Sequence, residues 1–233
     1  MKIYITFFAA LLLLTSCHHI AGSGNVITEK RDPGNFTGVS SADGIDVEIM
    51  QATAKEVTVE ADDNVIKYIQ TELSDGVLRI RLSRRHSFVD AHMKVYIKAP
   101  HIETINASSG SDVVVKNTFR SDRKLSFTAS SSADITADID APEVDSQASS
   151  GATVILSGRT QTHNAEASSS GDIKSYELLS ENTSVTASSG ASAKVHASVK
   201  LVASASSGAD IAYRGAANVE KTTSSGGSIE KKD

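Results

Sequence analysis

One short motif occurs seven times between residue 107 and residue 226 of this 233-residue chain. The motif is Ala-Ser-Ser followed by Gly or Ser, with Thr in place of Ala in the last copy; the copies begin at Ala107, Ala129, Ala148, Ala167, Ala187, Ala205 and Thr223. Successive copies are separated by 22, 19, 19, 20, 18 and 18 residues. Repetition at a nearly fixed interval indicates a repeat architecture, in which each unit packs against its neighbours.

Each copy is followed by residues that are typical of β-strands. A small residue comes first, then often Asp, then β-branched residues, as in Ser111-Asp112-Val113-Val114. Between copies, apolar and polar residues alternate, as they do from Leu125 to Ala129, which favours strand. Helical solenoids need repeats of about 33 residues or more. We therefore predict an all-β fold: a right-handed parallel β-helix, or β-solenoid, with about seven Ala-Ser-Ser-Gly rungs and an irregular β head.

Stacking of rungs at about 4.8 Å would place equivalent residues above one another. The alanines then form an inward column, because only a small side chain fits a thin core. The two serine columns form ladders of hydroxyl groups, and the Gly or Ser position supplies a corner with positive φ. A flexible Ser/Gly linker would lack the Val, Ile and Leu residues that recur at fixed offsets here. A β-sandwich with serine-rich turns is the remaining alternative.

The N-terminus resembles a bacterial lipoprotein signal peptide. The apolar run from Ile3 to Leu14 follows a basic residue and is too short for a transmembrane helix, which needs about 20 apolar residues. Leu14-Thr15-Ser16-Cys17 is similar to the lipobox, and the resemblance implies cleavage before Cys17 and attachment of diacylglycerol to its thiol. Because this cysteine is the only one, no intramolecular disulfide can form. We expect residues 1–16 to be the signal peptide and residues 17–35 to be a flexible tether.

Residues 36–105 differ from the repeats and form the predicted β head. Strands are expected at residues 45–51, 56–61, 65–72, 77–82 and 93–98. The repeats occupy residues 106–233, and residues 36–230 are expected to form one continuous domain. Basic residues cluster in the head, where they indicate a solvated face or a binding patch for acidic glycans or lipid head groups: Arg79, Arg81, Arg84, Arg85 and Lys94.

The head resembles a known family. The segments from Phe36 to Ser40 and from Gly44 to Ile49 are similar to the opening of the head GIN domain family of putative auto-transporter adhesins. The Gly-Ile-Asn of that family stands here as Gly44-Ile45-Asp46. The segments from Val57 to Asn64 and from Asp75 to Ile80 also resemble it, and the repeats match its later part, so the resemblance covers residues 36–230. It implies a β-helical domain on a cell-envelope protein and brings no catalytic residues.

Sequence motifs of enzymes were sought and not found. The chain has no Gly-rich phosphate loop, no His-Glu-x-x-His and no Gly-x-Ser-x-Gly. Its serines have no His at a recurring offset to activate them, so we predict no enzyme and no cofactor. The strongest opposing observation is a group of acids in one rung, which could supply the two carboxyls of a glycosidase: Asp134, Asp138, Asp140, Glu143 and Asp145.

Four aspartates take the same place in the repeat and are the candidate metal ligands: Asp112, Asp134, Asp172 and Asp210. The first two should lie on adjacent rungs, about 5 Å apart, where carboxylates repel each other unless a cation or a donor lies between them. Calcium would suit such oxygen ligands. The alternative is that each aspartate caps its own turn.

Together these features predict a lipid-anchored interaction module of the cell envelope, adhesin-like and without catalysis. The membrane would be reached through the lipid on Cys17, and the partner would be a glycan or an envelope protein; the formal net charge of −5 argues against nucleic acid. We expect the outer membrane, with either a periplasmic or a surface-exposed orientation. Two alternatives stay open: a carbohydrate-binding or carbohydrate-degrading β-helix protein, and a periplasmic accessory that acts through a protein partner.

Overall fold

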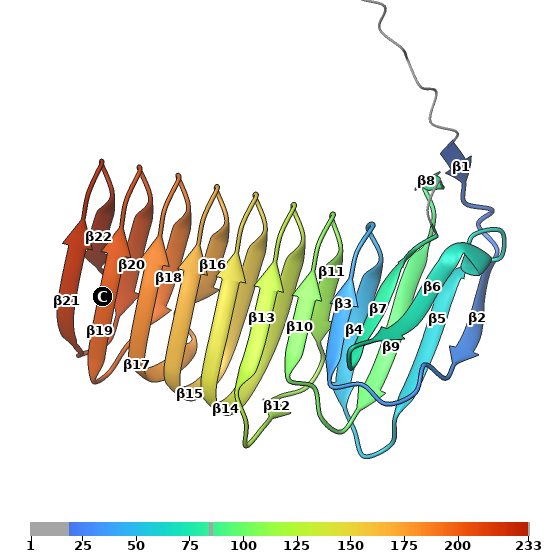
Figure 1. The fold of residues 1–233 in the computed structure, drawn as a ribbon, viewed down its shortest axis with the longest axis horizontal. Helices are drawn as coiled ribbons and strands as arrows, with labels where there is room; N and C mark the ends of the chain where they lie inside the picture. The colour runs from blue at the N-terminus through green and yellow to red at the C-terminus, as the bar shows by residue number, and fades with distance from the viewer. Residues whose placement is uncertain (1–18, 84–85, 233) are drawn as a thin grey trace, which may run out of the picture.

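The chain folds into an elongated β-solenoid (Figure 1). The computed structural model describes residues 19–83 and 86–232. In these residues one sheet of 20 strands contains the whole solenoid, a second sheet has two strands, and the only helical element is a 3-10 turn, η1 (Ile66–Tyr68). The prediction of an all-β solenoid is confirmed.

Each rung places one strand on each of two faces, which a tight turn joins at one edge and a bend joins at the other (Figure 1). Strands of the Ala face end at the repeat alanines, and strands of the Asp face begin at the aspartate position. The Ala face contains β3 (Gly38–Ser41), β10 (Thr104–Ala107), β13 (Leu125–Ala129), the second halves of β14 (Asp134–Ala148) and β15 (Thr153–Ala167), β17 (Leu178–Ala187), β19 (Lys200–Ala205) and β21 (Asn218–Thr223). The Asp face contains β4 (Asp46–Gln51), β11 (Asp112–Val115), the first halves of β14 and β15, β16 (Asp172–Ser175), β18 (Ser192–His196), β20 (Asp210–Arg214) and β22 (Ser228–Lys231). Neighbours on each face are parallel, and the short β12 (Phe119–Arg120) pairs with β14 at the bend edge.

The Ser-Ser-Gly segments form the tight turns. In the first full copy, the N–H of Ser111 donates to the carbonyl of Ser108 at 3.2 Å. Both central residues, Ser109 and Gly110, have positive φ, 53° and 74°. This pattern matches the type I′ turn, whose twist suits two strands joined directly. Turns of successive rungs are bonded through the backbone, since the N–H of Gly110 donates to the carbonyl of Ser131 at 3.0 Å and the bond recurs along the stack.

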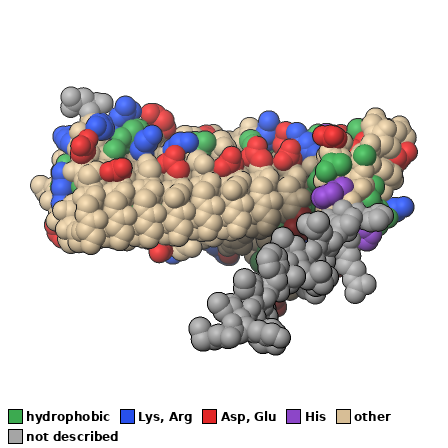
Figure 2. Space-filling model, turned by 90° about the horizontal axis from the view of Figure 1, so that it is seen from above, with side chains coloured by type: hydrophobic (Ala, Val, Ile, Leu, Met, Phe, Trp, Pro, Cys, Tyr) green, Lys and Arg blue, Asp and Glu red, His purple; other side chains and the backbone are tan. Residues whose placement is uncertain are grey.

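The hydroxyl ladders that we expected from the two serine columns are not formed. Among the described repeat serines, one hydroxyl bonds to another rung: Ser108 Oγ donates to the carbonyl of Ser41 at 3.4 Å. The serines instead adopt the turn conformation, and their backbone carbonyls accept hydrogen bonds from N–H groups of the neighbouring turns. Seen from above, the turn edge is an uncharged ridge beside rows of charged side chains (Figure 2).

The inward alanine column is confirmed. Its members are at most 2% exposed: Ala107, Ala129, Ala148, Ala167, Ala187 and Ala205. On the Asp face, the residue after the aspartate position faces the same core and is mostly Val or Ile, with at most 1% exposure: Val113, Ile135, Val154, Ile173, Ala193 and Ile211. The core is therefore thin beside the turns and built from aliphatic side chains stacked in register.

The Gly44-Ile45-Asp46 motif belongs to the turn of an additional rung. Strand β10 pairs with β3, which places Ser41 beside Ala107, and the N–H of Gly44 donates to the carbonyl of Ser109 at 2.9 Å. Asp43 and Gly44 have positive φ, 63° and 72°, like the central residues of the other turns. Ser41-Ala42-Asp43-Gly44 thus takes the place of Ala-Ser-Ser-Gly, which its sequence conceals because only the glycine is shared.

The head is inserted after this rung and closes one end of the solenoid. β7 (Val77–Leu82) extends the Ala face and β9 (Met93–Ala99) extends the Asp face, each by a parallel strand. β6 (Ile69–Ser74), β5 (Glu56–Asp62) and β2 (Val26–Arg31) then add antiparallel strands. Val65 and Ile66, in the connection between β5 and β6, are buried. The other end of the described stack is formed by β21 and β22, which pair on one side only.

Two expectations for the N-terminal part differ from the structure. Residues 66–68 form η1, so the strand predicted over residues 65–72 begins only at Ile69. The described part of the expected tether contains β2 and also β1 (His19–Ala21), which pairs with β8 (Ser87–Val89). Besides these strand pairings, the side chain of Asp62, a residue that is 2% exposed, accepts hydrogen bonds from the N–H groups of Gly24 and His92, both at 2.9 Å. This carboxylate ties the incoming chain to the head.

Candidate functional site

The aspartate column is divided into two parts. Asp112 pairs with Asp134, and the register of β11 with β4 places Asp46 on the other side of Asp112. Burial first, and then the charges of these two neighbours, raise the pKa of Asp112 above its usual value. Asp172 and Asp210 stand apart, because Thr153, Ser192 and Ser228 alternate with them along the column.

The candidate calcium ligands do not assemble a metal site of three or more acidic, His or Cys side chains anywhere in residues 19–83 and 86–232. Asp172 pairs with Lys174 at 3.2 Å, and Asp210 accepts a hydrogen bond from Ser228 Oγ at 2.5 Å. The three adjacent acids near the head are thus a row of mutually repelling charges.

The crowded acids of β14 are bonded to neighbouring rungs. Arg159 Nε and Nη2 donate to the two carboxylate oxygens of Asp140 at 2.9 and 2.7 Å, and this guanidinium lowers the pKa of Asp140. Three of the other four acids also have partners: Glu143 and Asp145 pair with Lys124 at 3.1 and 2.5 Å, and Asp138 accepts hydrogen bonds from Thr118 and Ser157. The fourth, Asp134, belongs to the aspartate column and lies beside Asp112. A glycosidase acid needs a raised pKa, which is the opposite of the shift at Asp140.

Both histidines of the repeat region contact serines in ways that activate no hydroxyl. Ser146 Oγ lies 2.8 Å from Nε2 of His163, but both residues are 0% exposed and no substrate reaches them. Ser180 Oγ donates to the backbone carbonyl of His196, whose Nδ1 lies 3.3 Å from the carbonyl of Ser180. A nucleophilic serine needs an accessible hydroxyl bonded to the imidazole itself.

The basic cluster of the head is partly neutralised. Arg81 pairs with Glu72 at 2.9 Å and Lys94 pairs with Glu48 at 2.7 Å, while Arg79 is exposed on β7. Arg84 and Arg85 lie outside the described residues, as does the lipidation candidate Cys17. Among the residues described, no helix has the length and hydrophobicity needed to cross a membrane.

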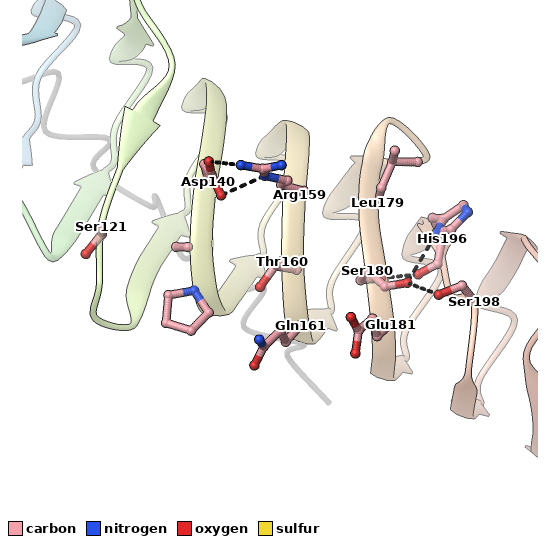
Figure 3. A pocket seen from close by; sticks show the side chains of 12 residues that line it. Ser121, Asp140, Arg159, Thr160, Gln161, Leu179, Ser180, Glu181, His196 and Ser198 are labelled. Carbon is pink, nitrogen blue, oxygen red and sulfur yellow. Dashed lines mark hydrogen bonds and ion pairs between the residues drawn. The ribbon is translucent and has the colours of Figure 1, made fainter.

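A groove with a volume of about 670 Å³ runs along the bend edge across successive rungs (Figure 3). We call it the bend groove, and it is lined by Ser121, Asp140, Ala141, Pro142, Arg159, Thr160, Gln161, Leu179, Ser180, Glu181, His196 and Ser198. Ser121 lies at one end of the view and His196 and Ser198 lie at the other, with the ion pair of Asp140 and Arg159 between them (Figure 3).

The bend groove exists because neighbouring rungs differ in length. Ser175 pairs with Val195, and Asn182 pairs with Lys200. The segment from Ser175 to Asn182 is therefore two residues longer than the segment from Val195 to Lys200 that lies beside it on the next rung. The longer bend carries Leu179, whose side chain is 56% exposed. We did not identify the groove from the sequence, although the change of repeat interval from 20 to 18 residues marks it.

Several polar groups in the bend groove have no partner in the described structure. Gln161 and Glu181 are exposed, and their side chains form no hydrogen bond or ion pair with the residues described. Arg159 binds Asp140 through Nε and Nη2, which leaves Nη1 available. Donors and acceptors therefore face the groove beside the apolar side chains of Pro142 and Leu179.

Solved structures of similar fold come from Bacteroides and Parabacteroides species. A putative adhesin from Bacteroides fragilis NCTC 9343 has a TM-score of 0.85 at 17% identity, over 91% of this chain and 100% of that chain. A putative adhesin from Parabacteroides merdae ATCC 43184 has a TM-score of 0.72 at 16% identity, over 92% and 99%. A putative lipid binding protein from Parabacteroides distasonis ATCC 8503 has a TM-score of 0.70 at 17% identity, over 93% and 100%. At these identities the likeness shows the fold alone.

The family resemblance is confirmed over most of the chain. The search of curated proteins gives no match. The model of the family described as "Putative auto-transporter adhesin, head GIN domain" matches residues 35–217, which include the Gly44-Ile45-Asp46 turn and six of the seven repeat motifs. The chain therefore belongs to the head GIN domain family.

Proposed function

We propose that this protein is a non-catalytic, adhesin-like binding module of the cell envelope, anchored by a lipid on Cys17. The observation that carries the proposal is the bend groove, in which the exposed side chains of Gln161 and Glu181 have no partner among the described residues and lie beside the apolar side chains of Pro142 and Leu179. Family membership and the lipobox-like sequence support the envelope location.

The absence of catalysis is part of the proposal and rests on the geometry of the described side chains. Ser146 and His163, which would make a nucleophile and base, are enclosed in the core. Asp140, one of the two acids that line the groove, is held in a bidentate pair with Arg159, which favours its charged form. Binding needs neither an activated nucleophile nor a proton donor, so these side chains suit recognition better than hydrolysis.

Three measurements test the proposal on the full-length protein in its own cells. Metabolic labelling with an alkyne fatty acid should mark the wild-type protein and leave Cys17→Ser unlabelled. Protease added to intact cells should digest the wild-type protein, and cells that lack it should adhere less to a surface coated with polysaccharides. Protection until the outer membrane is opened, together with unchanged adhesion, would refute the adhesin-like role and favour a periplasmic accessory.

A further inference from the structure

We propose that the bend groove binds an uncharged oligosaccharide that lies across the rungs. This inference rests on the proposed function and specifies its ligand. The groove crosses successive rungs at one edge, so the positions that line it recur at the rung spacing of about 4.8 Å, although the side chains at these positions differ. A chain of pyranose rings has a comparable repeat, whereas a single small metabolite would occupy only one rung.

The available polar groups match hydroxyl groups. The amide of Gln161 can both donate and accept, the carboxylate of Glu181 accepts, and Nη1 of Arg159 donates. Arg159 and Gln161 lie on β15 and Glu181 lies on β17, and the pairing of Thr160 with Ser180 brings these two bends side by side. Sugar hydroxyls are both donors and acceptors, so one ring edge can satisfy this mixture without any charged group on the ligand.

The apolar part of the groove offers contact to the C–H faces of sugar rings. Leu179 is 56% exposed, the most exposed of the large hydrophobic side chains described, and it projects from the longer bend. Pro142 is exposed on the neighbouring part of the same groove. Burial of these surfaces beneath a ligand would contribute roughly 25 cal/mol for each Å² that is removed from water.

The charges of the groove give no net positive charge that would hold strongly acidic glycans. Arg159 and Arg120 share the carboxylate of Asp140, which lies 2.7 and 3.4 Å from their Nη atoms, so these three side chains leave one positive charge. Glu181 offsets it with a negative charge that has no partner among the described groups. A sulfated or uronic acid chain would meet no net attraction here and would place its own charges beside Glu181, so the neutral class is favoured.

The test is binding of the purified mature protein to an array of neutral and acidic glycans, followed by calorimetric titration with cellohexaose, xylohexaose, chitohexaose and maltohexaose. The groove variant is Gln161→Ala/Glu181→Ala. Its matched control is Gln147→Ala/Glu166→Ala, which removes an exposed and unbonded Gln and Glu from the Ala face, where the two residues pair across β14 and β15. We expect neutral glycans to be retained, and the groove variant to bind at least about tenfold more weakly than the control.

Three outcomes would overturn the inference: no neutral glycan is retained, only acidic glycans are retained, or both double variants lose the same affinity. A second groove variant, Leu179→Lys, separates the loss of a ligand contact from misfolding. The exposed position should accept lysine without loss of the fold, whereas a sugar ring that packs on Leu179 should bind more weakly. Adhesion of intact cells distinguishes the two proposals. If the groove variants adhere like the wild type while cells without the protein do not, the adhesin-like function stands and the groove assignment fails.

Discussion

Ser146 Oγ and His163 Nε2 form a 2.8 Å hydrogen bond in the centre of the solenoid, where both side chains are fully buried. Nδ1 of His163 has no hydrogen-bond partner among the described atoms. His163 takes a core position between Val144 and Thr183 on the adjacent rungs. Burial lowers its pKa from 6.5 to about 4. This histidine is therefore a neutral core side chain whose protonation opposes folding.

The first prediction is that stability falls as the pH falls from 6.5 to 4. In that window the unfolded chain binds a proton at His163 and the native chain does not, so the free energy of unfolding decreases by up to about 3 kcal/mol. Below the native pKa this histidine adds no further loss. Urea unfolding at pH 7, 5.5 and 4 measures the effect. The variant Ser146→Ala/His163→Leu should lose most of this dependence, whereas the exposed-site control His101→Gln should keep it; equal slopes for all three proteins would contradict the account.

The second prediction concerns the alanine column. Ala148 is 1% exposed and lies between Ala129 and Ala167 on the adjacent rungs. Ala148→Leu should destabilise the protein by about 1–3 kcal/mol, because additional methylenes do not fit a packed core. The control Gln147→Leu adds a side chain of the same type at the exposed neighbouring position and should change the free energy of unfolding by less than about 0.5 kcal/mol. Comparable losses at both positions would mean that the column is not tightly packed.

The third prediction concerns the turns. Ser132 occupies the position of the turn glycine with a φ of 60°. Ser132→Gly should raise the free energy of unfolding by about 0.5–1 kcal/mol, because glycine avoids the strain of a left-handed conformation at a smaller entropic cost. Ser130, two residues earlier, is outside the positive-φ set, so Ser130→Gly should destabilise instead. Chemical denaturation of the two variants gives the signs, and stabilisation by both or by neither would contradict the turn assignment.

The fold was predictable from the sequence where one residue type satisfies one local requirement. Ala107 and its equivalents had to be small and inward, and Gly110 had to accept positive φ. The additional rung was not recognised because Ser41 replaces the alanine and its hydroxyl is satisfied locally, donating to the carbonyl of Ile45 at 2.9 Å. The bend groove arises from a difference in length between two successive rungs. No residue type in either rung is characteristic of such a groove, so a search for motifs does not find it.

The fourth prediction addresses the aspartate column. Asp112 lies between Asp46 and Asp134, and its raised pKa means that the native state binds its proton more tightly than the unfolded state. The contribution of this group to stability therefore falls as the pH rises through that pKa. Asp112→Asn should raise the melting temperature at pH 7, and EDTA should leave the wild-type melting temperature unchanged. A bound calcium ion would produce the opposite pair of results, with losses from both the substitution and the chelator.

The fifth prediction concerns the last described rung, where two lysines stand in core-facing register. Lys221 of β21 pairs with Ala203, and Lys231 of β22 pairs with Tyr213, and both of these partners are buried. Nζ of Lys221 lies 4.8 Å from the centroid of the Tyr213 ring and 3.4 Å from the carbonyl of Ile229, so the side chain crosses the end of the core. Charged residues that point inward at a sheet edge oppose pairing with another chain.

Replacing both lysines should remove this protection, because the unpaired edges of β21 and β22 would then border an apolar core end. Lys221→Leu/Lys231→Leu should increase in apparent mass with concentration in sedimentation velocity, while the wild type should keep one mass over the same range. The control Lys194→Leu/Lys200→Leu removes two charges from outward positions on β18 and β19 and should sediment like the wild type. If the control associated to the same extent, the increase in apparent mass would result from the loss of net charge. The core-facing register, which only Lys221 and Lys231 share, would then have no part in it.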